Sequence, residues 1–286
     1  MRLLGDERTS PTWLLLENVP FMLQLDGGEA MRYLTSELGR LGYRWAYRVV
    51  DARSFGLPQR RRRVILLASR TEDPRPVLFE EDAGEIDRLP QKDSVCGFYW
   101  TEGLRGLGWA VDAVPTLKGG SSIGIPSPPA MWLRRRKVPL RTPDIRDAER
   151  LQGFPADWTA IASEAGRGAR WRLVGNAVSV PVARWVGNRL KRDRGTWDDA
   201  HLTEEPVERG WPVAAWGEDD RAYAVPVSPW PRHDTYIRLG KFLEHGTKPL
   251  SHRAALGFYE RTQRSGLNFA DGFIESVRKH VAAVSP

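Results

Sequence analysis

The sequence predicts an α/β protein, and three observations carry that prediction. Residues 13–18 place an apolar run directly before the polar pair Glu17 and Asn18, which is typical of an interior strand that ends at the mouth of a sheet. Residues 27–43 repeat apolar side chains at helical spacing, and residues 43–52 and 63–69 have strand patterns. Strand, helix, strand, loop, strand is the order found in α/β sheets.

The helix within residues 27–43 is indicated by four apolar residues at helical spacing, and Gly42 marks its expected end. After residue 69 the periodicity fades. Pro, Gly and Ser become frequent between residues 70 and 130, which predicts an irregular, loop-rich region.

A further helix is predicted over residues 144–154, because Thr142 and Asp144 are both candidates for its N-cap. Residues 171–190 are expected to form a strand followed by a helix. From about residue 196 a Trp- and Pro-rich linker leads into helical segments that extend close to the C-terminus.

Length and charge limit the possible classes of protein. A chain of 286 residues is long enough for a large core and for two domains. The net charge of +7 is compatible with a nucleic-acid partner, and much of it is concentrated in the clusters Arg60–Arg63 and Arg134–Lys137. The simpler interpretation of such runs is a solvated basic surface.

The single cysteine, Cys96, excludes an internal disulfide framework and a cysteine-rich zinc site. No apolar stretch approaches the length of a membrane span, and the first ten residues lack an apolar signal core. These features favour a cytoplasmic protein with no membrane partner and no metal.

Four stretches of the chain, in order, resemble conserved blocks of one enzyme family, the DNA (cytosine-5)-methyltransferases. They are LLLENVPFM (14–22), DARSFGLPQRRRRVILLA (51–68), RTPDIRDAERLQGFPADW (141–158) and RLVGNAVSVPVARWVG (172–187), which are similar to the sixth, eighth, ninth and tenth blocks. The resemblance implies part of a Rossmann-like, S-adenosylmethionine-dependent methyltransferase sheet, an irregular target-recognition region and a helical C-terminal extension.

The chemistry of the family explains why a carboxyl group is needed at a strand end. Such enzymes flip cytosine out of the duplex and add a cysteine thiolate to carbon 6, so that carbon 5 can attack the methyl group of S-adenosylmethionine. An acid at ring nitrogen 3 eases this addition. The resemblance implies that Glu17 is this acid and that Asn18 shapes the turn behind it; the alternative is a polar strand end that faces water.

The basic run Arg60–Arg63 follows Gln59 and matches the family pattern Gln, any, Arg, any, Arg. The resemblance therefore assigns catalytic contacts with the flipped nucleotide to Arg61 and Arg63, since a planar, charged fork suits its oxygen atoms. Arg60 and Arg62 fall on the variable positions.

The resemblance also implies a DNA-binding and a cofactor-binding set. The DNA-binding residues are Asn18, Gln59, Thr116, Leu117, Gly119 and Gly120. Gly175 and Asn176 are expected to line the S-adenosylmethionine pocket. Two simpler interpretations remain open: a flexible loop for the glycines at 119 and 120, and a helix-start cap for Gly175 and Asn176. Residues 146–154 of the ninth block are expected to be structural.

These assignments divide the chain into four expected segments. They are the second half of the catalytic domain (1–69), the target-recognition region (70–133), its support and the return to the catalytic domain (134–195), and a linker with a helical extension (196–286).

The family's Gly-rich donor loop and its Pro-Cys nucleophile loop have no counterpart in this sequence. Cys96 has no preceding proline and is expected to be a small buried thiol. The sequence therefore predicts one subunit of a split bacterial enzyme, associated with the nucleoid, that acts on double-stranded DNA together with a partner carrying the cysteine. The alternative is a catalytically inactive, methyltransferase-derived DNA-binding or regulatory protein.

Overall fold

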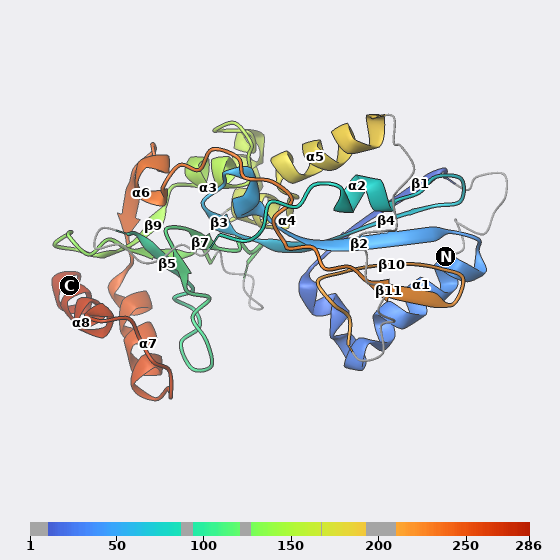
Figure 1. Cartoon of the computed structure of the whole chain (residues 1–286). Coiled ribbons are helices and arrows are strands. Elements are labelled where there is room, and N and C mark those ends of the chain that lie inside the picture. Colours follow the sequence, from blue (N-terminus) through green and yellow to red (C-terminus); the bar gives the residue numbers. More distant parts are fainter. Residues whose placement is uncertain (1–10, 87–93, 121–126, 167, 193–209) are drawn as a thin grey trace. The chain divides into compact units, whose positions relative to one another are not determined.

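The helices and strands of the chain group into two compact units (Figure 1). A computed structural model describes residues 11–86, 94–120, 127–166, 168–192 and 210–286. The first unit takes in the described residues of Met1–Phe55, Arg62–Ile86 and Pro181–Asp234, and the second takes in those of Gly56–Arg61, Asp87–Val180 and Thr235–Pro286. Each unit is built from segments that alternate along the chain, whereas the sequence predicts four consecutive segments.

A five-stranded antiparallel sheet forms the centre of the first unit, with the strand order β1-β4-β2-β10-β11. The strands are β1 Trp13–Asn18, β2 Arg44–Asp51, β4 Arg62–Ser69, β10 Ala214–Glu218 and β11 Arg221–Ala224. The helices are η1 Pro20–Leu23, η2 Leu25–Gly28, α1 Glu29–Arg40, η3 Ala52–Phe55, α2 Arg75–Phe79 and, apart from its first residue, α5 Val180–Lys191.

The connection between β1 and β2 confirms the predicted α/β class. Both strands are antiparallel to β4, which lies between them, so they run in the same direction and are joined through α1. The helix α1 starts after Gly28 and stops before Gly42, whose φ of 74° is the left-handed conformation expected at a helix end. Part of the segment predicted as a linker supplies β10 and β11.

Each face of this sheet has its own apolar core, because successive side chains of a strand point to opposite faces. On one face, Tyr47 and Leu66 pack with Met31 of α1. On the other face, Ile65 packs with a cluster that includes Trp185 of α5. Helices therefore cover both faces of the sheet in the first unit.

The strand β1 ends where the sequence predicts, with Glu17 and Asn18 at its carboxyl end. In the part of the chain that the structure describes, β1 is the edge strand, since its one neighbour in the sheet order is β4. Leu15 is 50% exposed. The prediction of an interior strand is therefore wrong for this chain by itself, because an edge strand has a neighbour on one side only.

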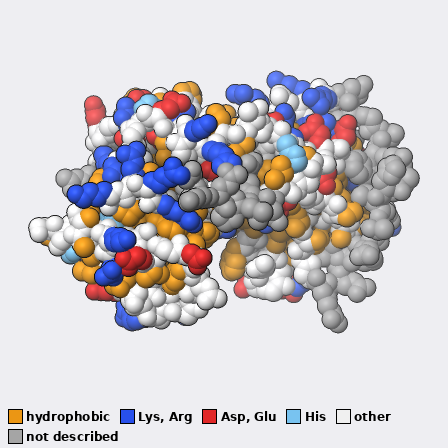
Figure 2. Space-filling model, turned by 60° about the vertical axis from the view of Figure 1, so that its left-hand side comes forward, with side chains coloured by type: hydrophobic (Ala, Val, Ile, Leu, Met, Phe, Trp, Pro, Cys, Tyr) orange, Lys and Arg blue, Asp and Glu red, His pale blue; other side chains and the backbone are white. Residues whose placement is uncertain are grey.

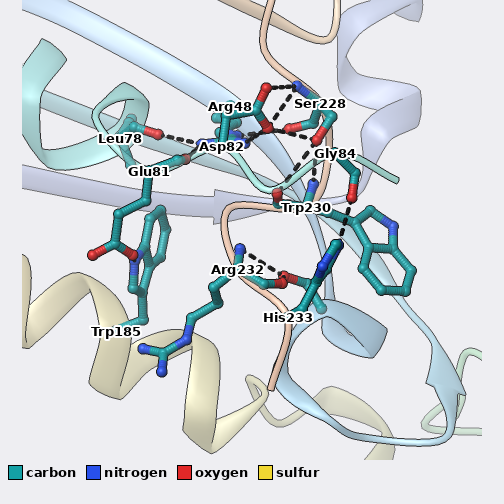
Figure 3. Close-up of polar contacts among 11 residues, drawn as sticks. Arg48, Leu78, Glu81, Asp82, Gly84, Trp185, Ser228, Trp230, Arg232 and His233 are labelled. Atoms are coloured by element: carbon teal, nitrogen blue, oxygen red, sulfur yellow. Dashed lines mark hydrogen bonds and ion pairs between the residues drawn. The ribbon is translucent and has the colours of Figure 1, made fainter. Parts of the chain in front are cut away.

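The buried side chain of Arg48 joins β2 to two later segments of the first unit (Figure 3). Its guanidinium donates hydrogen bonds to the main-chain oxygens of Leu78, Glu81 and Ser228. It also pairs with Asp82 at 2.7 Å. Burial lowers the pKa of Arg48 to about 10, so the side chain keeps its charge near neutral pH. The segment around Ser228 is thereby fixed to the sheet.

The second unit contains a sheet with the strand order β12-β9-β8-β5-β6 and a parallel pair of β3 and β7. The strands are β3 Gln59–Arg60, β5 Cys96–Phe98, β6 Ala110–Val111, β7 Val114–Pro115, β8 Ala130–Trp132, β9 Leu140–Pro143 and β12 Thr247–Pro249. The helices are α3 Ile145–Leu151, η4 Ala160–Ala165, α4 Ala169–Asn176, α6 Leu239–Phe242, α7 His252–Gln263 and α8 Phe273–Ala283. The predicted loop-rich region thus includes several short strands.

Two helices of the second unit test the local predictions. The helix α3 begins as predicted, since the side chain of Asp144 accepts a hydrogen bond from the backbone N–H of Arg146. The expectation of a strand at the start of residues 171–190 is wrong, because residues 171–176 belong to α4. Trp171 and Val174 are three residues apart and pack in the same core cluster, as expected on one face of a helix. In so short a run, the apolar spacing does not distinguish a strand, with a period of 2, from a helix, with a period of 3.6.

The C-terminal helices α7 and α8 complete the core of the second unit. Phe258 and Phe273 are fully buried, and each ring centroid lies 5.1 Å from that of Phe98 in β5. The strand β12 pairs with β9 and extends the same sheet. The helical extension is therefore part of the folded unit that contains β5 to β9.

His280 of α8 ties this extension to the sheet and makes its stability depend on pH. Its Nδ1 accepts a hydrogen bond from the N–H of Leu140, and its Nε2 lies 2.8 Å from the carbonyl oxygen of Leu250. Both contacts are satisfied by the neutral ring with a proton on Nε2. Burial lowers the pKa of His280 below its ordinary value of 6.5.

We therefore expect the free energy of unfolding to fall as the pH is lowered through 6.5. Below that pH the unfolded chain takes up a proton that folded His280 does not, until the pH passes its lowered pKa. Urea unfolding of the wild type and His280→Gln between pH 7.5 and 5 measures this effect. The variant should be less stable at pH 7.5 and lose less stability on acidification; parallel curves would contradict the assignment.

Candidate functional site

Glu17 and Arg63 form an ion pair at the carboxyl end of β1 in the first unit. Nε of Arg63 lies 2.9 Å from Oε1 of Glu17, and the two side chains are 14% and 28% exposed. The register pairs Glu17 with Ile65, so Arg63 is the diagonal neighbour two residues along β4. The guanidinium thus orients a carboxyl group that solvent still reaches. A group so placed can exchange a proton with a ligand or hydrogen-bond to it.

Asn18 shapes the turn that follows this carboxyl group. Its Oδ1 accepts a hydrogen bond from the backbone N–H of Val19 at 2.8 Å. The next residue, Pro20, starts η1. The chain therefore leaves β1 immediately after the ion pair.

The run Arg60–Arg63 crosses from one unit to the other, and its side chains have different partners. Arg62 pairs with Glu85 at 2.5 Å and with the buried carboxylate of Asp51 at 3.3 Å. The variable position Arg62 is therefore engaged by acidic residues of its own unit. A uniformly solvated basic loop does not describe this segment.

In the second unit, the buried amide of Gln59 connects the segment around Leu117 with the end of α3 at Leu151. Its Oε1 accepts a hydrogen bond from the N–H of Leu117 at 3.0 Å, and its Nε2 donates to the carbonyl oxygen of Leu151 at 2.8 Å. Gln59 therefore fixes the position of Leu117, which is itself 1% exposed. Both Gln59 and Leu117 therefore lie inside the second unit, and their hydrogen bond fixes the backbone at residue 117.

Arg61 makes a second link within the same unit. It is 3% exposed and donates hydrogen bonds to the carbonyl oxygens of Ala177 at 2.6 Å and Leu117 at 3.4 Å. Thr116 adds a bond from its hydroxyl to the carbonyl oxygen of Arg60 at 2.9 Å. Arg61, which was predicted to bind the nucleotide, has internal partners in this structure. It joins the stretch at 51–68, which resembles the eighth block, to the segments around residues 117 and 177.

The glycines at 119 and 175 are required by a close approach of two backbones. A Cβ on Gly175 would lie 2.2 Å from the nitrogen of Gly119 and from the carbonyl carbon of Lys118. A Cβ on Gly119 would lie 2.3 Å from Oδ1 of Asn176. Gly120 has a φ of 141°. Gly119 therefore has a packing role that an ordinary flexible loop would not need.

Asn176 is the last residue of α4 and is exposed. The alternative explanation of Gly175 and Asn176 as a helix-start cap is wrong, because they end a helix. Its exposed amide offers N–H donors and a carbonyl acceptor to a ligand.

Cys96 lies in β5 and is fully buried. Burial raises the pKa of its thiol, and its Sγ lies 3.9 Å from the carbonyl oxygen of Ser94. A thiol in such surroundings is inert, because the thiolate is the reactive form. Cys96 is a core residue of the second unit.

The expectation that residues 146–154 are structural agrees with the hydrogen bonds of Gln152, whereas the sequence interpretation missed the part played by main-chain atoms. Nε2 of this buried side chain donates to the carbonyl oxygen of Val174 at 2.8 Å, and its Oε1 accepts from Ser179 at 3.3 Å. The position of Gln152 in the stretch at 141–158, which resembles the ninth block, was the sequence signal for this structural role. The carbonyl group of Ala177, which Arg61 binds, leaves no signal in a sequence.

Among the described residues, no cluster of three or more His, Cys, Asp or Glu side chains could hold a metal ion. None of the helices in that part of the chain has both the length and the apolar character needed to cross a bilayer.

Comparison with known proteins adds a family and several relatives. A family model described as C-5 cytosine-specific DNA methylase matches residues 5–95 and 129–192. Type II methyltransferase M2.BsuMI of Bacillus subtilis (strain 168) is 55% identical over 94% of this chain and 71% of its own length. M.BspRI of Lysinibacillus sphaericus is 36% identical over 70% and 55%, and M.MspI of Moraxella sp is 26% identical over 62% and 45%. The chain spans about half the length of the last two.

Proposed function

Because the chain belongs to the C-5 cytosine-specific DNA methylases, whose cofactor is S-adenosylmethionine, we propose that it is one subunit of a split DNA (cytosine-5)-methyltransferase. It supplies the acid that activates cytosine, the DNA-recognition surface and part of the cofactor site, and a partner supplies the nucleophilic cysteine. The pairing of Glu17 with Arg63 is the observation that carries this proposal. A DNA-binding module has no need for an oriented, accessible carboxyl group.

In the proposed reaction, Glu17 donates a proton or a hydrogen bond to ring nitrogen 3 of a flipped cytosine while the partner's thiolate adds to carbon 6. Arg63 holds the carboxyl group in position and contacts the nucleotide. S-adenosylmethionine would supply the methyl group that carbon 5 receives. Carbon 5 then loses its proton and the bond between carbon 6 and sulfur breaks, which releases 5-methylcytosine and the partner's thiolate. The buried thiol of Cys96 is unsuited to the addition, which supports a nucleophile on another chain.

In this proposal the second unit supplies the DNA-recognition surface and part of the cofactor site. Thr116, Gly119 and Gly120 present the backbone to DNA, and Gln59 and Leu117 support that segment from inside. Arg61 acts by fixing residues 117 and 177 through their carbonyl oxygens. Asn176, with Gly175 behind it, contacts S-adenosylmethionine.

The edge strand β1 supports the existence of a partner. Apolar side chains on and after it are exposed: Leu15 by 50%, Val19 by 45%, Phe21 by 63% and Leu25 by 41%. Among the described residues no strand pairs with the outer edge of β1, and an unpaired edge beside apolar side chains is a liability that proteins cover. We place the partner subunit on this surface. The bacterial type II relatives favour a role in restriction–modification, on DNA in the cytoplasm.

The proposal is tested by methyl transfer from labelled S-adenosylmethionine to duplex DNA. The chain is assayed alone and after co-expression with the product of the adjacent gene. Activity confined to the pair supports the split enzyme. Activity of the chain alone refutes it, and DNA binding without methyl transfer by the pair supports the alternative of an inactive, methyltransferase-derived DNA-binding protein.

A further inference from the structure

One stretch of the second unit is rich in basic residues. Residues 113–143 contain six Lys and Arg and no Asp or Glu, and Asp112 and Asp144 lie directly outside this stretch. One of the six, Lys118, is paired with Glu102. Four of the six are consecutive, from Arg134 to Lys137. None of the residues assigned to DNA binding or catalysis by the family resemblance lies among these four.

The structure places these four residues at the turn of the hairpin formed by β8 and β9 in the second unit, and all four are exposed. The backbone N–H of Leu133 donates to the carbonyl oxygen of Pro139, and that of Arg136 donates to the carbonyl oxygen of Leu133. The strands below the turn are anchored by Trp132 and Leu140, which are 2% and 0% exposed. The turn is therefore presented on an ordered support.

Arg141 in β9 adds to the positive charge near the turn. Burial, and after it the charge of Arg136, lowers the pKa of Arg141. Lys248 is exposed on the adjacent strand β12, opposite Thr142, and its charge also acts on the carboxyl group of Asp144. Figure 2 shows Lys and Arg side chains gathered on the left-hand part of the face in view. Crowding of like charges is unfavourable in the free protein and is relieved when an anion binds.

We propose that the turn Arg134–Lys137 binds the phosphate backbone of DNA and sets the position of the second unit along the duplex, independently of base sequence. This inference rests on the proposed function, which makes DNA the substrate. Arginine forks suit phosphate oxygens, and a row of them suits a linear polyanion better than a globular protein surface. The guanidinium of Arg134 lies 4.1 Å from the centroid of the Trp132 ring, which holds its stem in place.

The test compares two double variants of the full chain, each lacking two exposed positive charges of the second unit. Arg136→Gln with Lys137→Gln alters the turn, and Arg278→Gln with Lys279→Gln alters α8, where the side chains are 65% and 68% exposed. Arg134 is left intact because it packs on Trp132. Affinity for a random-sequence duplex is measured from 50 to 400 mM KCl, with the chain alone and with its co-expressed partner, and thermal unfolding checks the fold.

Log affinity falls as log salt rises. In the turn variant this slope should be less steep by about 1 to 2, since each lost phosphate contact removes about 0.9 from its magnitude. The α8 variant should retain the wild-type slope. Equal losses in both variants, or an unchanged slope in the turn variant, would overturn the inference while DNA binding by the wild type still stands. Loss of the partner without a change in slope would overturn it in favour of a protein contact. No DNA binding by the wild-type pair would refute the proposed function itself.

Discussion

Replacement of Glu17 by Gln in the assembled enzyme should lower the rate of methyl transfer by a factor of about 10² to 10⁴, the usual contribution of a general acid. Glutamine has nearly the same size but cannot donate the carboxyl proton, and it loses the ion pair with Arg63. The affinity for duplex DNA should change little, because the substitution leaves the second unit untouched. Single-turnover methyl transfer and DNA affinity, measured on the same preparation, separate the two effects.

Glu29→Gln provides the matched control. Glu29 lies at the start of α1 in the same unit, pairs with Arg32 at 2.9 Å and is 70% exposed. Its substitution removes the same charge without touching the proposed site, so the rate should remain at the wild-type level. A rate for Glu17→Gln within a few-fold of the wild type would show that Glu17 is not the activating acid.

Replacement of Gly175 by Ala should destabilise the chain by about 1 to 3 kcal/mol, the usual cost of overpacking. The added methyl group would meet the backbone of Lys118 and Gly119 at 2.2 Å, and neither backbone segment can move aside as a flexible side chain would. Methyl transfer by the assembled enzyme should fall as well, because Asn176 and the segment at 118–119 would be displaced. Urea unfolding and methyl transfer measure the two consequences.

Gly187→Ala is the control for this prediction. Gly187 lies inside α5, and a Cβ there would meet no atom within 4 Å. Alanine is the better helix former by about 1 kcal/mol, so this variant should be at least as stable as the wild type and fully active. Equal stability of Gly175→Ala and Gly187→Ala would mean that the close approach at residues 119 and 175 is not a constraint.

The parts of the fold that follow from local pattern were predictable. The apolar spacing in residues 27–43 and the polar end of β1 correspond to observed elements, and Asp144 caps α3 as expected. The strand β10 was not predicted. It pairs with β2, where Trp216 lies opposite Ala46, and a pairing across so many residues leaves no periodic signal in a Trp- and Pro-rich segment.

In the candidate site too, the sequence indicates which residue types matter but not where tertiary packing places them. The ordered stretches identify Glu17 and Arg63 as residues of interest, and the β1–β4 register brings them together. Burial of Arg61 could not be foreseen, since its hydrogen bonds go to main-chain oxygens of residues far away in sequence. Whether an arginine contacts substrate or supports a neighbouring loop depends on tertiary packing, which a motif does not encode.

Covalent capture by DNA containing 5-fluorocytosine tests the central claim most directly. Addition of the nucleophile and methyl transfer to this base leave no proton on carbon 5 to remove, so the attacking chain remains attached to the DNA. The assembled pair is incubated with such a duplex and S-adenosylmethionine, and the linked chain is identified by mass spectrometry. We predict that only the partner becomes attached, through its cysteine, and that Glu17→Gln reduces the yield. Attachment through Cys96 of this chain would contradict the account.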